Sequence, residues 1–291
     1  MGTPVIAIAN QKGGVGKTTT AINLAACLTV QRQNVLLIDL DPQANATSGL
    51  GVEKAQGQSI YRALLGEVQA DTLVRPTAYK RLDIIASEVD LAGAEVDIAR
   101  ADNYLHRLKE ALVPVTNQDR YDFIFVDCPP SLGILTMNAL TAAESLLIPL
   151  QCEYYALEGL SVIIDLVEKL RTSGTNPGLR LEGIVMTMYD GRTNLSQAVV
   201  QDVYKHFGNR IYETLIPRTI RLGEAPSFGK PIIDHDRQSV GAVAYLQLAK
   251  EFLQRRGSEE SRTFPFQDES PIAAAAEAEA AQPESSEELP Q

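Results

Sequence analysis

A glycine-rich segment from Asn10 to Thr20 is the part of this sequence whose residue types could most directly do chemistry. It follows the apolar run Val5–Ala9 and reads NQKGGVGKTTT before a stretch with helical periodicity begins. Glycines let consecutive backbone N–H groups curve around phosphate oxygens, and the N-terminus of a following helix adds partial positive charge. The order of strand, glycine-rich loop, Gly-Lys-Thr and helix therefore predicts a site for nucleotide phosphates.

Two side chains of this segment have the chemistry that a bound nucleotide needs. Lys17 would bridge the β- and γ-phosphates of ATP, and the hydroxyl of Thr18 would ligate Mg²⁺. The rest of the loop around the phosphates would come from Gly13, Gly14, Val15, Gly16 and Thr19. The strict pattern G-x-x-x-x-G-K-S/T fails at its first position, where Gln11 replaces glycine, and Lys12 adds a second lysine. We expect the protein to bind ATP with Mg²⁺ and to hydrolyse it.

Acidic residues end two further apolar runs, where a sheet of this kind would border its ligand. Asp39 and Asp41 close the run that begins at Val35, and their spacing of two directs both side chains to one face. Asp127 ends the run Asp122–Asp127 and would hold Mg²⁺ through water, while Asp39 would support the metal or the loop. An acid at a strand end is often a simple turn former, but two of them beside a phosphate loop favour a role at the nucleotide.

Short apolar runs that alternate with longer amphipathic segments have to position these groups. The predicted strands are nearly continuous in Val, Ile, Leu and Phe, which is typical of strands covered on both faces. They are Val5–Ala9, Val35–Asp39, Leu82–Ala86, Asp122–Asp127, Leu146–Leu150 and Gly183–Met188. The predicted helices between them are Thr18–Val30, Asp102–Val113, Thr136–Ala143, Leu157–Arg171 and Leu195–His206. This alternation predicts an α/β fold with a doubly wound, mostly parallel sheet of the P-loop NTPase type and helices on both faces.

The composition divides the chain into a balanced body and an acidic end. The 291 residues carry a formal net charge of −11, and 45% of them are hydrophobic. Nine acidic residues and one arginine follow residue 256, whereas the rest of the chain has 25 basic and 28 acidic residues. We predict one ATPase domain over residues 1–256 and an acidic, disordered tail over residues 257–291. The tail has too little apolar surface to offset its ordering entropy.

Cysteine usage and hydropathy predict a soluble cytoplasmic protein. Cys27, Cys128 and Cys152 have no metal-binding or disulfide-framework spacing, which favours reduced structural thiols. The first residues lack a basic leader, and no apolar run approaches the roughly 20 residues that span a bilayer. The segment Val243–Arg256 is amphipathic and ends in two arginines, but the acidic tail after it would be repelled by an anionic membrane. We expect that helix to pack on the core, without stable membrane association.

The loop sequence KGGVGKTTT resembles the deviant Walker A family of ATPases, and the resemblance extends over residues 4–254. In that family the additional lysine reaches across a nucleotide-bound homodimer to the partner's phosphates, and Lys12 matches its position. The resemblance makes Lys12, Lys17 and Asp41 the catalytic residues, with Asp41 positioning the attacking water. It also implies that the segment Pro129–Gly133 senses the γ-phosphate. The plainer alternative is that Lys12 only strengthens local attraction for phosphate.

Longer strings are similar to those of the ParA/Soj partition ATPases within that family. These are DPQANATSGLG (Asp41–Gly51), DCPPSLG (Asp127–Gly133), QCEYYALEGL (Gln151–Leu160) and IPRTIRLGEAPSFGKPI (Ile216–Ile232). The resemblance implies that Pro217 and Arg218 border the adenine, and that Arg192 and Arg221 contact non-specific double-stranded DNA. It further implies a ParB-like activating protein and a nucleoid-associated location in the cytoplasm. Ala44 departs from the family pattern, which usually has glycine there, and this affects loop flexibility.

The residues alone support DNA binding only in part. Basic residues form a stripe in the last third of the chain, namely Arg192, Lys205, Arg210, Arg218, Arg221, Lys230 and Arg237. Such a stripe could neutralise DNA phosphates without reading sequence, but a solvated face explains it as well. A related ATPase could instead position a non-DNA cargo, such as a protein compartment or receptor cluster, or cycle on a membrane as MinD-like proteins do. An iron–sulfur reductase would need paired cysteines, which the spacing does not provide.

Overall fold

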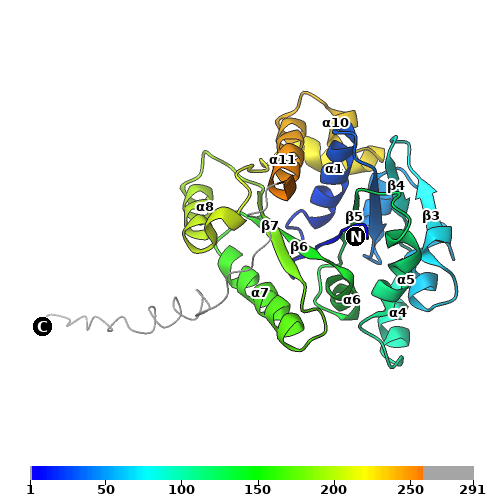
Figure 1. Ribbon diagram of the computed structural model, residues 1–291. Coiled ribbons are helices and arrows are strands. Elements are labelled where there is room, and N and C mark those ends of the chain that lie inside the picture. The colour runs from blue at the N-terminus through cyan, green and yellow to red at the C-terminus, as the bar shows by residue number, and fades with distance from the viewer. Residues whose placement is uncertain (1, 258–291) are drawn as a thin grey trace, which may run out of the picture.

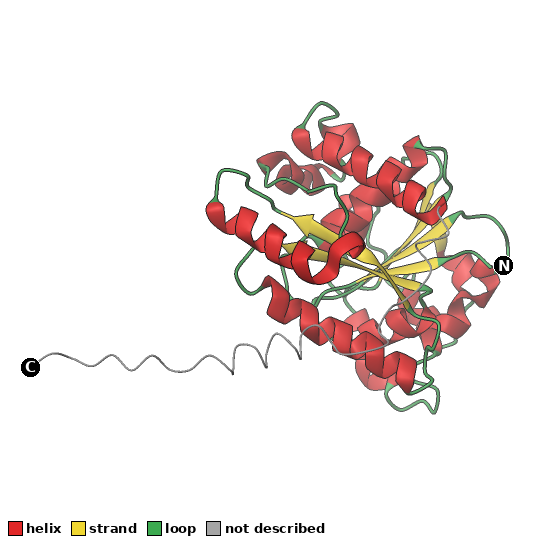
Figure 2. Ribbon diagram, turned by 60° about the vertical axis from the view of Figure 1, so that its left-hand side comes forward, coloured by secondary structure: helices red, strands yellow, loops and turns green. Residues whose placement is uncertain are grey.

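The computed structural model describes residues 2–257, which fold around a seven-stranded sheet covered by helices on both faces (Figures 1 and 2). The strands are β1 (Val5–Ile8), β2 (Val35–Asp39), β3 (Val74–Pro76), β4 (Leu82–Ile85), β5 (Phe123–Asp127), β6 (Ser145–Gln151) and β7 (Arg180–Thr187). Their order across the sheet is β3-β4-β2-β5-β1-β6-β7, and neighbours are parallel except for β3 with β4. The predicted doubly wound, mostly parallel sheet is confirmed.

Alternate residues of the central strands face two different helical layers. Ile6 and Ile8 point into the core beneath the layer at the top of Figure 1, whereas Val5 and Ala7 point into the opposite core. The first layer contains α1 (Lys17–Val30), α2 (Asn45–Gly49), α9 (Ile220–Glu224), α10 (Ile232–His235) and α11 (Val240–Gly257). The second contains α3 (Ile60–Leu64), α4 (Leu91–Ile98), α5 (Arg107–Thr116), α6 (Ile134–Ala142), α7 (Ala156–Thr172) and α8 (Asn194–Phe207). Burial on both faces is why the strands lack polar alternation.

The strand order changes direction at β1, which places a ligand crevice there. The chain passes from β1 to β2 on one side, and β6 and β7 lie on the other side. In an open parallel sheet, ligands bind outside the carboxyl ends of the strands at such a point. Asp127 pairs in register with both Ile8 and Asp39, so the phosphate loop and these two acids emerge at one edge. The topology thus brings together three segments that are far apart in the sequence.

One predicted helix is wrong in its first turn, and one strand was not predicted. The structure begins α5 at Arg107 and not at Asp102, and continues it to Thr116. The reason lies in another element, because the Asn138 side chain of α6 accepts a hydrogen bond from the backbone N–H of Leu108 at 3.1 Å. The missed strand β3 is a three-residue antiparallel edge that ends in proline, where local propensity gives little signal.

Helix α11 packs on α1, as predicted for the segment Val243–Arg256. Phe252 is fully buried, and the Tyr245 hydroxyl lies 3.2 Å from that of Thr20 in α1. Within residues 2–257 no helix is long and apolar enough to cross a membrane. The predicted tail lies outside the described residues from residue 258 onward, while Gly257 is the last residue of α11.

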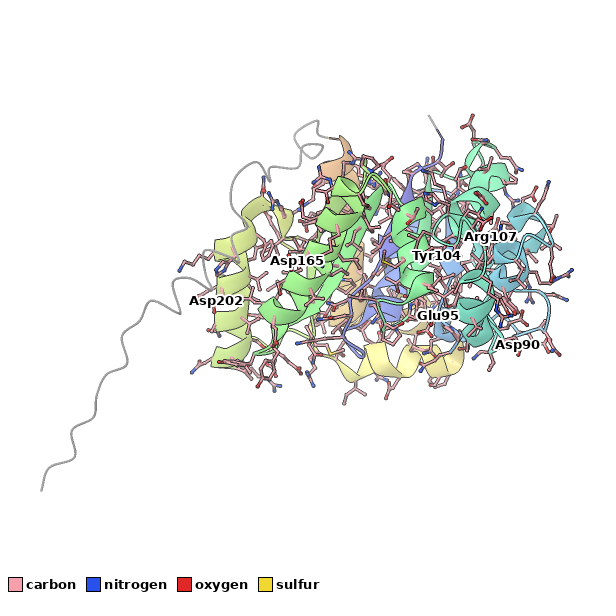
Figure 3. The ribbon with its side chains drawn as sticks, turned by 90° about the horizontal axis from the view of Figure 1, so that it is seen from below. Asp90, Glu95, Tyr104, Arg107, Asp165 and Asp202 are labelled. Atoms are coloured by element: carbon pink, nitrogen blue, oxygen red, sulfur yellow. The ribbon has the colours of Figure 1, made fainter. Side chains whose placement is uncertain are left out.

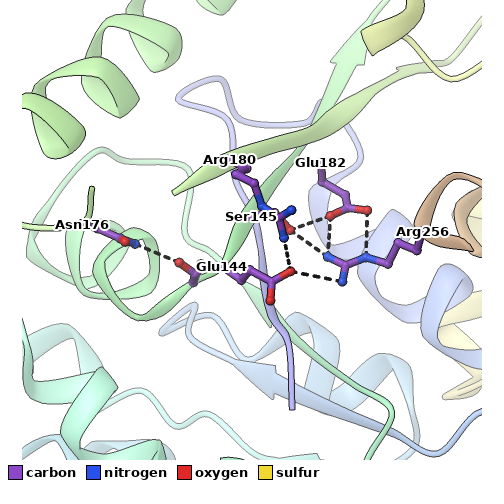
Figure 4. Close-up of polar contacts among 7 residues, drawn as sticks. Glu144, Ser145, Asn176, Arg180, Glu182 and Arg256 are labelled. Atoms are coloured by element: carbon purple, nitrogen blue, oxygen red, sulfur yellow. Dashed lines mark hydrogen bonds and ion pairs between the residues drawn. The ribbon is translucent and has the colours of Figure 1, made fainter. Parts of the chain in front are cut away.

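The end of α11 is fixed by a partly buried ion-pair cluster at the starts of β6 and β7 (Figure 4). Arg256 donates to both carboxylate oxygens of Glu182, at 3.0 and 2.5 Å, and pairs with Glu144 at 3.3 Å. Its side chain is 17% exposed and that of Glu182 only 6%. Arg180 also pairs with Glu144. The last turn of α11 is therefore held to the sheet by charge as well as by apolar packing.

We expect Arg256→Ala to lower the free energy of unfolding by about 3 kcal/mol, because it leaves the Glu182 carboxylate buried without its partner. Urea denaturation checks this value. The matched control is Lys250→Ala, which removes an exposed cation from the same helix and should change stability little. Equal effects of the two substitutions would show that the cluster contributes nothing beyond helix propensity.

Candidate nucleotide-binding site

The phosphate loop has the backbone shape that an anion cradle requires. Gly14 and Gly16 adopt φ angles of 74° and 87°, in the left-handed region that glycine occupies without strain. Gly13 and Gly14 are exposed, and a Cβ at Gly14 would meet nothing within 4 Å. No side chain caps the start of α1, so the N–H groups of its first turn remain available to an anion.

Lys17 and Lys12 occupy positions around this cradle. Lys17 is 6% exposed, and its Nζ donates to the backbone carbonyl oxygen of Lys12 at 2.8 Å. Burial lowers the pKa of Lys17, and the negative charge of Asp127 opposes that shift. The Lys12 side chain turns to its own chain, where its ammonium group donates to the carbonyl oxygen of Tyr155. The Lys17 side chain is therefore buried against the phosphate loop, whereas the Lys12 side chain is bonded to the residue that precedes α7.

Asp127 has the environment expected for a carboxylate that serves a metal ion. Both of its side-chain oxygens are buried and accept no hydrogen bond of normal geometry. Burial and then the charge of Asp39 raise its pKa well above the usual range, while the nearby Thr18 hydroxyl and Lys17 oppose that shift. A buried carboxylate without partners is unfavourable unless a cation or ordered water completes it. Asp127 and Thr18 therefore fit a Mg²⁺ site shared with nucleotide phosphates.

Asp39 is bound into the protein to a greater extent than Asp127. Its Oδ2 accepts from the backbone N–H and the hydroxyl of Thr47, both at 2.7 Å, and its Oδ1 accepts from the N–H of Asp41 at 3.2 Å. Burial nevertheless raises the pKa of Asp39 to about 6. These contacts fit the supporting role considered for Asp39 better than direct metal ligation. They also tie the start of α2 to the end of β2.

Asp41 lies just beyond β2, at the rim of the same crevice. It is 6% exposed, and its Oδ1 accepts from the backbone N–H of Gln43 at 2.9 Å. Ser87 fixes the backbone here, because its hydroxyl donates to the carbonyl oxygen of Asp41 at 2.6 Å. The Asp41 carboxylate is thus held beside the two buried carboxylates of Asp39 and Asp127.

We expect Asp127→Asn to raise the free energy of unfolding of the nucleotide-free protein at pH 7, on the order of 1 kcal/mol, by removing a buried charge. When folding raises the pKa of an acid, the folded protein becomes less stable as the pH rises from the unfolded-state pKa to the folded-state pKa. The gain should therefore shrink toward pH 4, where the wild-type carboxyl group is protonated in the folded chain. Urea denaturation at both pH values measures it. The same variant should bind Mg–ATP more weakly by calorimetry, and a stability loss at pH 7 would contradict this account.

A cavity of about 180 Å³ adjoins the phosphate loop on the side of Gly16 and Thr19. Pro217 and Arg218, which the resemblance placed beside adenine, are among its lining residues. The other residues around it are Thr187, Met188, Ile216, Thr219, Leu222, Gly223 and Tyr245. An apolar slot next to a phosphate loop suits a purine base. The sequence did not indicate Leu222 or Tyr245, because the cavity joins α9 and α11 to the end of β7.

The arginines predicted to contact DNA are exposed but paired with acids. Arg192, with its side chain 90% exposed, binds both oxygens of Asp190 at 2.9 and 2.7 Å. Its hydrogen bonds lower the pKa of Asp190 to about 2. Arg221 in α9 pairs with Glu224 at 3.1 Å and with Asp236 at 3.5 Å. Arg192 lies before α8, so the two arginines come from different elements.

The three cysteines are buried and form no disulfide, in agreement with structural thiols. Burial raises the pKa of Cys27 and of Cys152 to about 12 and also raises that of Cys128. Among residues 2–257 no group of three or more His, Cys, Asp and Glu side chains gathers as a metal site would. A magnesium ion here would take part of its coordination from phosphates and water.

A phosphate loop at the switch point of a doubly wound sheet, with acids at the ends of two adjacent strands, is the architecture of a P-loop NTPase. Residues 3–181 match the family model described as an AAA domain. The chain is 52% identical over 248 residues to the sporulation initiation inhibitor protein Soj of Bacillus subtilis. This alignment covers 85% of this chain and 97% of that protein. It is also 51% identical over 255 residues to the chromosome partitioning protein ParA of Myxococcus xanthus, and that alignment covers 86% of this chain and 88% of that protein.

The fold is also found in a solved structure with a bound nucleotide analogue. Cobyrinic acid a,c-diamide synthase from Mycobacterium smegmatis, with bound ATP analog and magnesium, is 36% identical with a TM-score of 0.77. The match covers 90% of this chain and 99% of that one. The chain belongs to the ParA/Soj family of chromosome-partitioning ATPases.

Proposed function

We propose that this partition ATPase works as a nucleotide-controlled switch. With ATP and Mg²⁺ it forms a homodimer that binds double-stranded DNA without sequence preference, and a ParB-like protein stimulates hydrolysis and release. The feature that carries the proposal is the phosphate loop with Lys12 in addition to Lys17. One lysine serves the phosphates of its own chain, and the second is free to act on those of a partner once it leaves α7.

Each residue of the site has a distinct task in this proposal. Lys17 and the loop N–H groups bind the phosphates, and Thr18 with Asp127 would hold Mg²⁺, the latter through water. A bound Mg²⁺ would supply positive charge that offsets the negative charge of the phosphates. Asp41 orients the attacking water, and Lys12 of the partner subunit stabilises the charge that develops on the transferred phosphoryl group.

Helix α9 connects the nucleotide to the proposed DNA contact. Leu222 and Gly223 line the cavity that suits a purine base, which we call the base cavity. The neighbouring Arg221 is exposed and pairs with acids. A nucleotide that orders this five-residue helix would also order Arg221. Such a connection supports DNA binding that depends on ATP.

The proposed DNA contact rests on Arg221 in α9, whose side chain is exposed. The face seen in Figure 3 carries both signs of charge, because Asp90, Glu95, Asp165 and Asp202 are labelled there together with Arg107. Binding of this kind is salt-dependent and sequence-independent, and it would place the protein on the nucleoid.

We expect Arg221→Ala to weaken ATP-dependent binding to duplex DNA at least about tenfold, since each subunit of the dimer loses one phosphate contact. The slope of log affinity against log salt should fall by about two for the dimer. Fluorescence anisotropy with a random duplex measures both. The control is Arg62→Ala, which removes a surface arginine paired with Glu67. DNA binding that is equal with and without ATP would count against the switch.

Turnover of ATP tests the proposed function as a whole. We expect slow hydrolysis by the protein alone and faster hydrolysis with duplex DNA and ParB-like peptides together. Stimulation by a peptide from a non-DNA cargo system, without any effect of DNA, would favour a positioning ATPase instead. Co-sedimentation with anionic liposomes in the presence of ATP would favour membrane cycling. Either result would mean that the protein works on a cargo or on a membrane and not on DNA.

A further inference from the structure

The side chain of Lys12 is held within its own chain by Tyr155, the residue that precedes the first turn of α7. Its ammonium group donates a hydrogen bond to the backbone carbonyl oxygen of Tyr155 and lies 5.5 Å from the centre of the Tyr155 ring. An aromatic face attracts a cation at this distance. Tyr155 is 62% exposed, so the contact lies at the surface, where it can form and break without opening the core.

Gly159, one turn further along α7, provides the space for the Lys12 stem. A Cβ at Gly159 would lie 3.0 Å from Cε of Lys12, which is tighter than most such contacts, and 3.4 Å from its Cδ. The helix itself would be more stable with alanine at this position. Glycine at this position therefore leaves room for the Lys12 stem, which a larger residue would displace.

The phosphate loop connects this contact to the nucleotide. The Nζ of Lys17 donates to the carbonyl oxygen of Lys12 at 2.8 Å, and the N–H of Lys12 donates to Asn10 Oδ1 at 3.0 Å. A bound phosphate would attract Lys17 away from that carbonyl, because a charge-assisted hydrogen bond is stronger than one to a neutral acceptor. Phosphate binding therefore loosens the backbone of the residue whose side chain α7 holds.

The same segment of chain also touches the base side of the site. Glu153, two residues before Tyr155, pairs with Arg218 at 3.8 Å, and Arg218 lines the base cavity. The segment from Glu153 to Gly159 thus contacts both ends of the nucleotide site, through Arg218 at the base and through Lys12 at the phosphates.

We propose that the start of α7, through Gly159 and the preceding residue Tyr155, is a holding site for Lys12 that keeps the chain monomeric until nucleotide binds. This inference rests on the proposed role of Lys12 in the dimer. A lysine that is hydrogen-bonded to its own α7 cannot reach the phosphates of a partner. Tyr155 is a positioning residue in this scheme, and it acts on the reaction only through Lys12.

Hydrogen exchange in the nucleotide-free protein tests the contact itself. Lys12→Met keeps the stem but removes the donor and the charge, so amides of residues 155–160 should exchange severalfold faster than in the wild type. Lys54→Met is the matched control, because the Nζ of Lys54 also donates to a backbone carbonyl, that of Gln43, at 2.8 Å. Unchanged exchange in Lys12→Met would overturn the holding site.

The consequence for assembly is tested with Gly159→Ala, which places a Cβ where the Lys12 stem lies. With a non-hydrolysable ATP analogue, its dimerisation midpoint by light scattering should fall at least about threefold in analogue concentration. Gly93→Ala in α4 has nothing within 4 Å of the new Cβ and should match the wild type. Tyr155→Leu, which removes the ring and leaves the carbonyl, should lower the midpoint to a smaller degree. A midpoint that is unchanged or higher in Gly159→Ala and Tyr155→Leu would overturn the proposal.

Failure of the holding site and failure of the dimer switch give different results. If the wild type does not dimerise with any ATP analogue, the proposed function is wrong, and the exchange data alone show whether α7 holds Lys12. If the wild type dimerises but neither variant shifts the midpoint, the switch stands and the holding site is wrong.

Discussion

Asp41→Ala should bind Mg–ATP with the affinity of the wild type but hydrolyse it at least about 100-fold more slowly. Asp41 lies at the rim of the crevice, while phosphate binding falls to the loop and to Lys17. Loss of the carboxylate therefore removes the group that orients water and leaves the binding groups in place. Calorimetry with Mg–ATP and steady-state phosphate release measure the two quantities separately.

Two further variants guard the interpretation of this result. Asp41→Asn keeps an acceptor for the N–H of Gln43, so it should preserve the turn while still losing turnover. Asp90→Ala, at the exposed start of α4, should leave both binding and turnover unchanged. Normal turnover in Asp41→Ala would exclude Asp41 from the reaction, and loss of binding would make it a structural residue of the loop.

Lys12→Ala should abolish ATP-dependent dimerisation, requiring at least about tenfold more protein for the same dimer fraction. Its ammonium group is proposed to reach phosphates of the partner, and a charge-assisted contact of this kind is among the stronger polar interactions. Light scattering with a non-hydrolysable analogue checks the result. Lys54→Ala is the control, since that lysine is also exposed and bound to a carbonyl oxygen.

The two dimerisation outcomes have distinct meanings for Lys12. A dimer that forms unchanged in Lys12→Ala would contradict action in trans and leave Lys12 as a local attractor of phosphate. Because Lys17 remains, ATP binding to the monomer should persist in the variant, and calorimetry can verify that the loop is intact. Loss of both properties would instead show that Lys12 shapes the loop.

The strands and the phosphate loop could be predicted because their signals are local. The predicted strand Val35–Asp39 is apolar up to its final acid, and the structure begins and ends β2 at the same residues. Gly14 and Gly16 of the loop carry the positive φ angles that glycine adopts without strain. Short-range patterns of this kind reflect backbone sterics and two-sided burial, which act on each segment independently.

Features that depend on distant partners could not be predicted in the same way. The start of α5 is set by Asn138, which lies 30 residues further along the chain. The base cavity includes Tyr245 from α11, and no pattern near the phosphate loop indicates it. Likewise, nothing in the sequence indicated that residues of the basic stripe form ion pairs. In the structure Arg221 pairs with Asp236, the residue that follows α10. Tertiary contacts decide these cases.

The unpartnered carboxylate of Asp127 has a consequence for the lifetime of the protein in a cell. A ligand that binds only the folded form stabilises it by mass action, and here that ligand would also relieve an unfavourable buried charge. Chains without nucleotide are then the ones that open most often and that proteases remove first. The abundance of the protein would follow the supply of ATP and magnesium, so that a starved cell would hold fewer copies even with transcription unchanged.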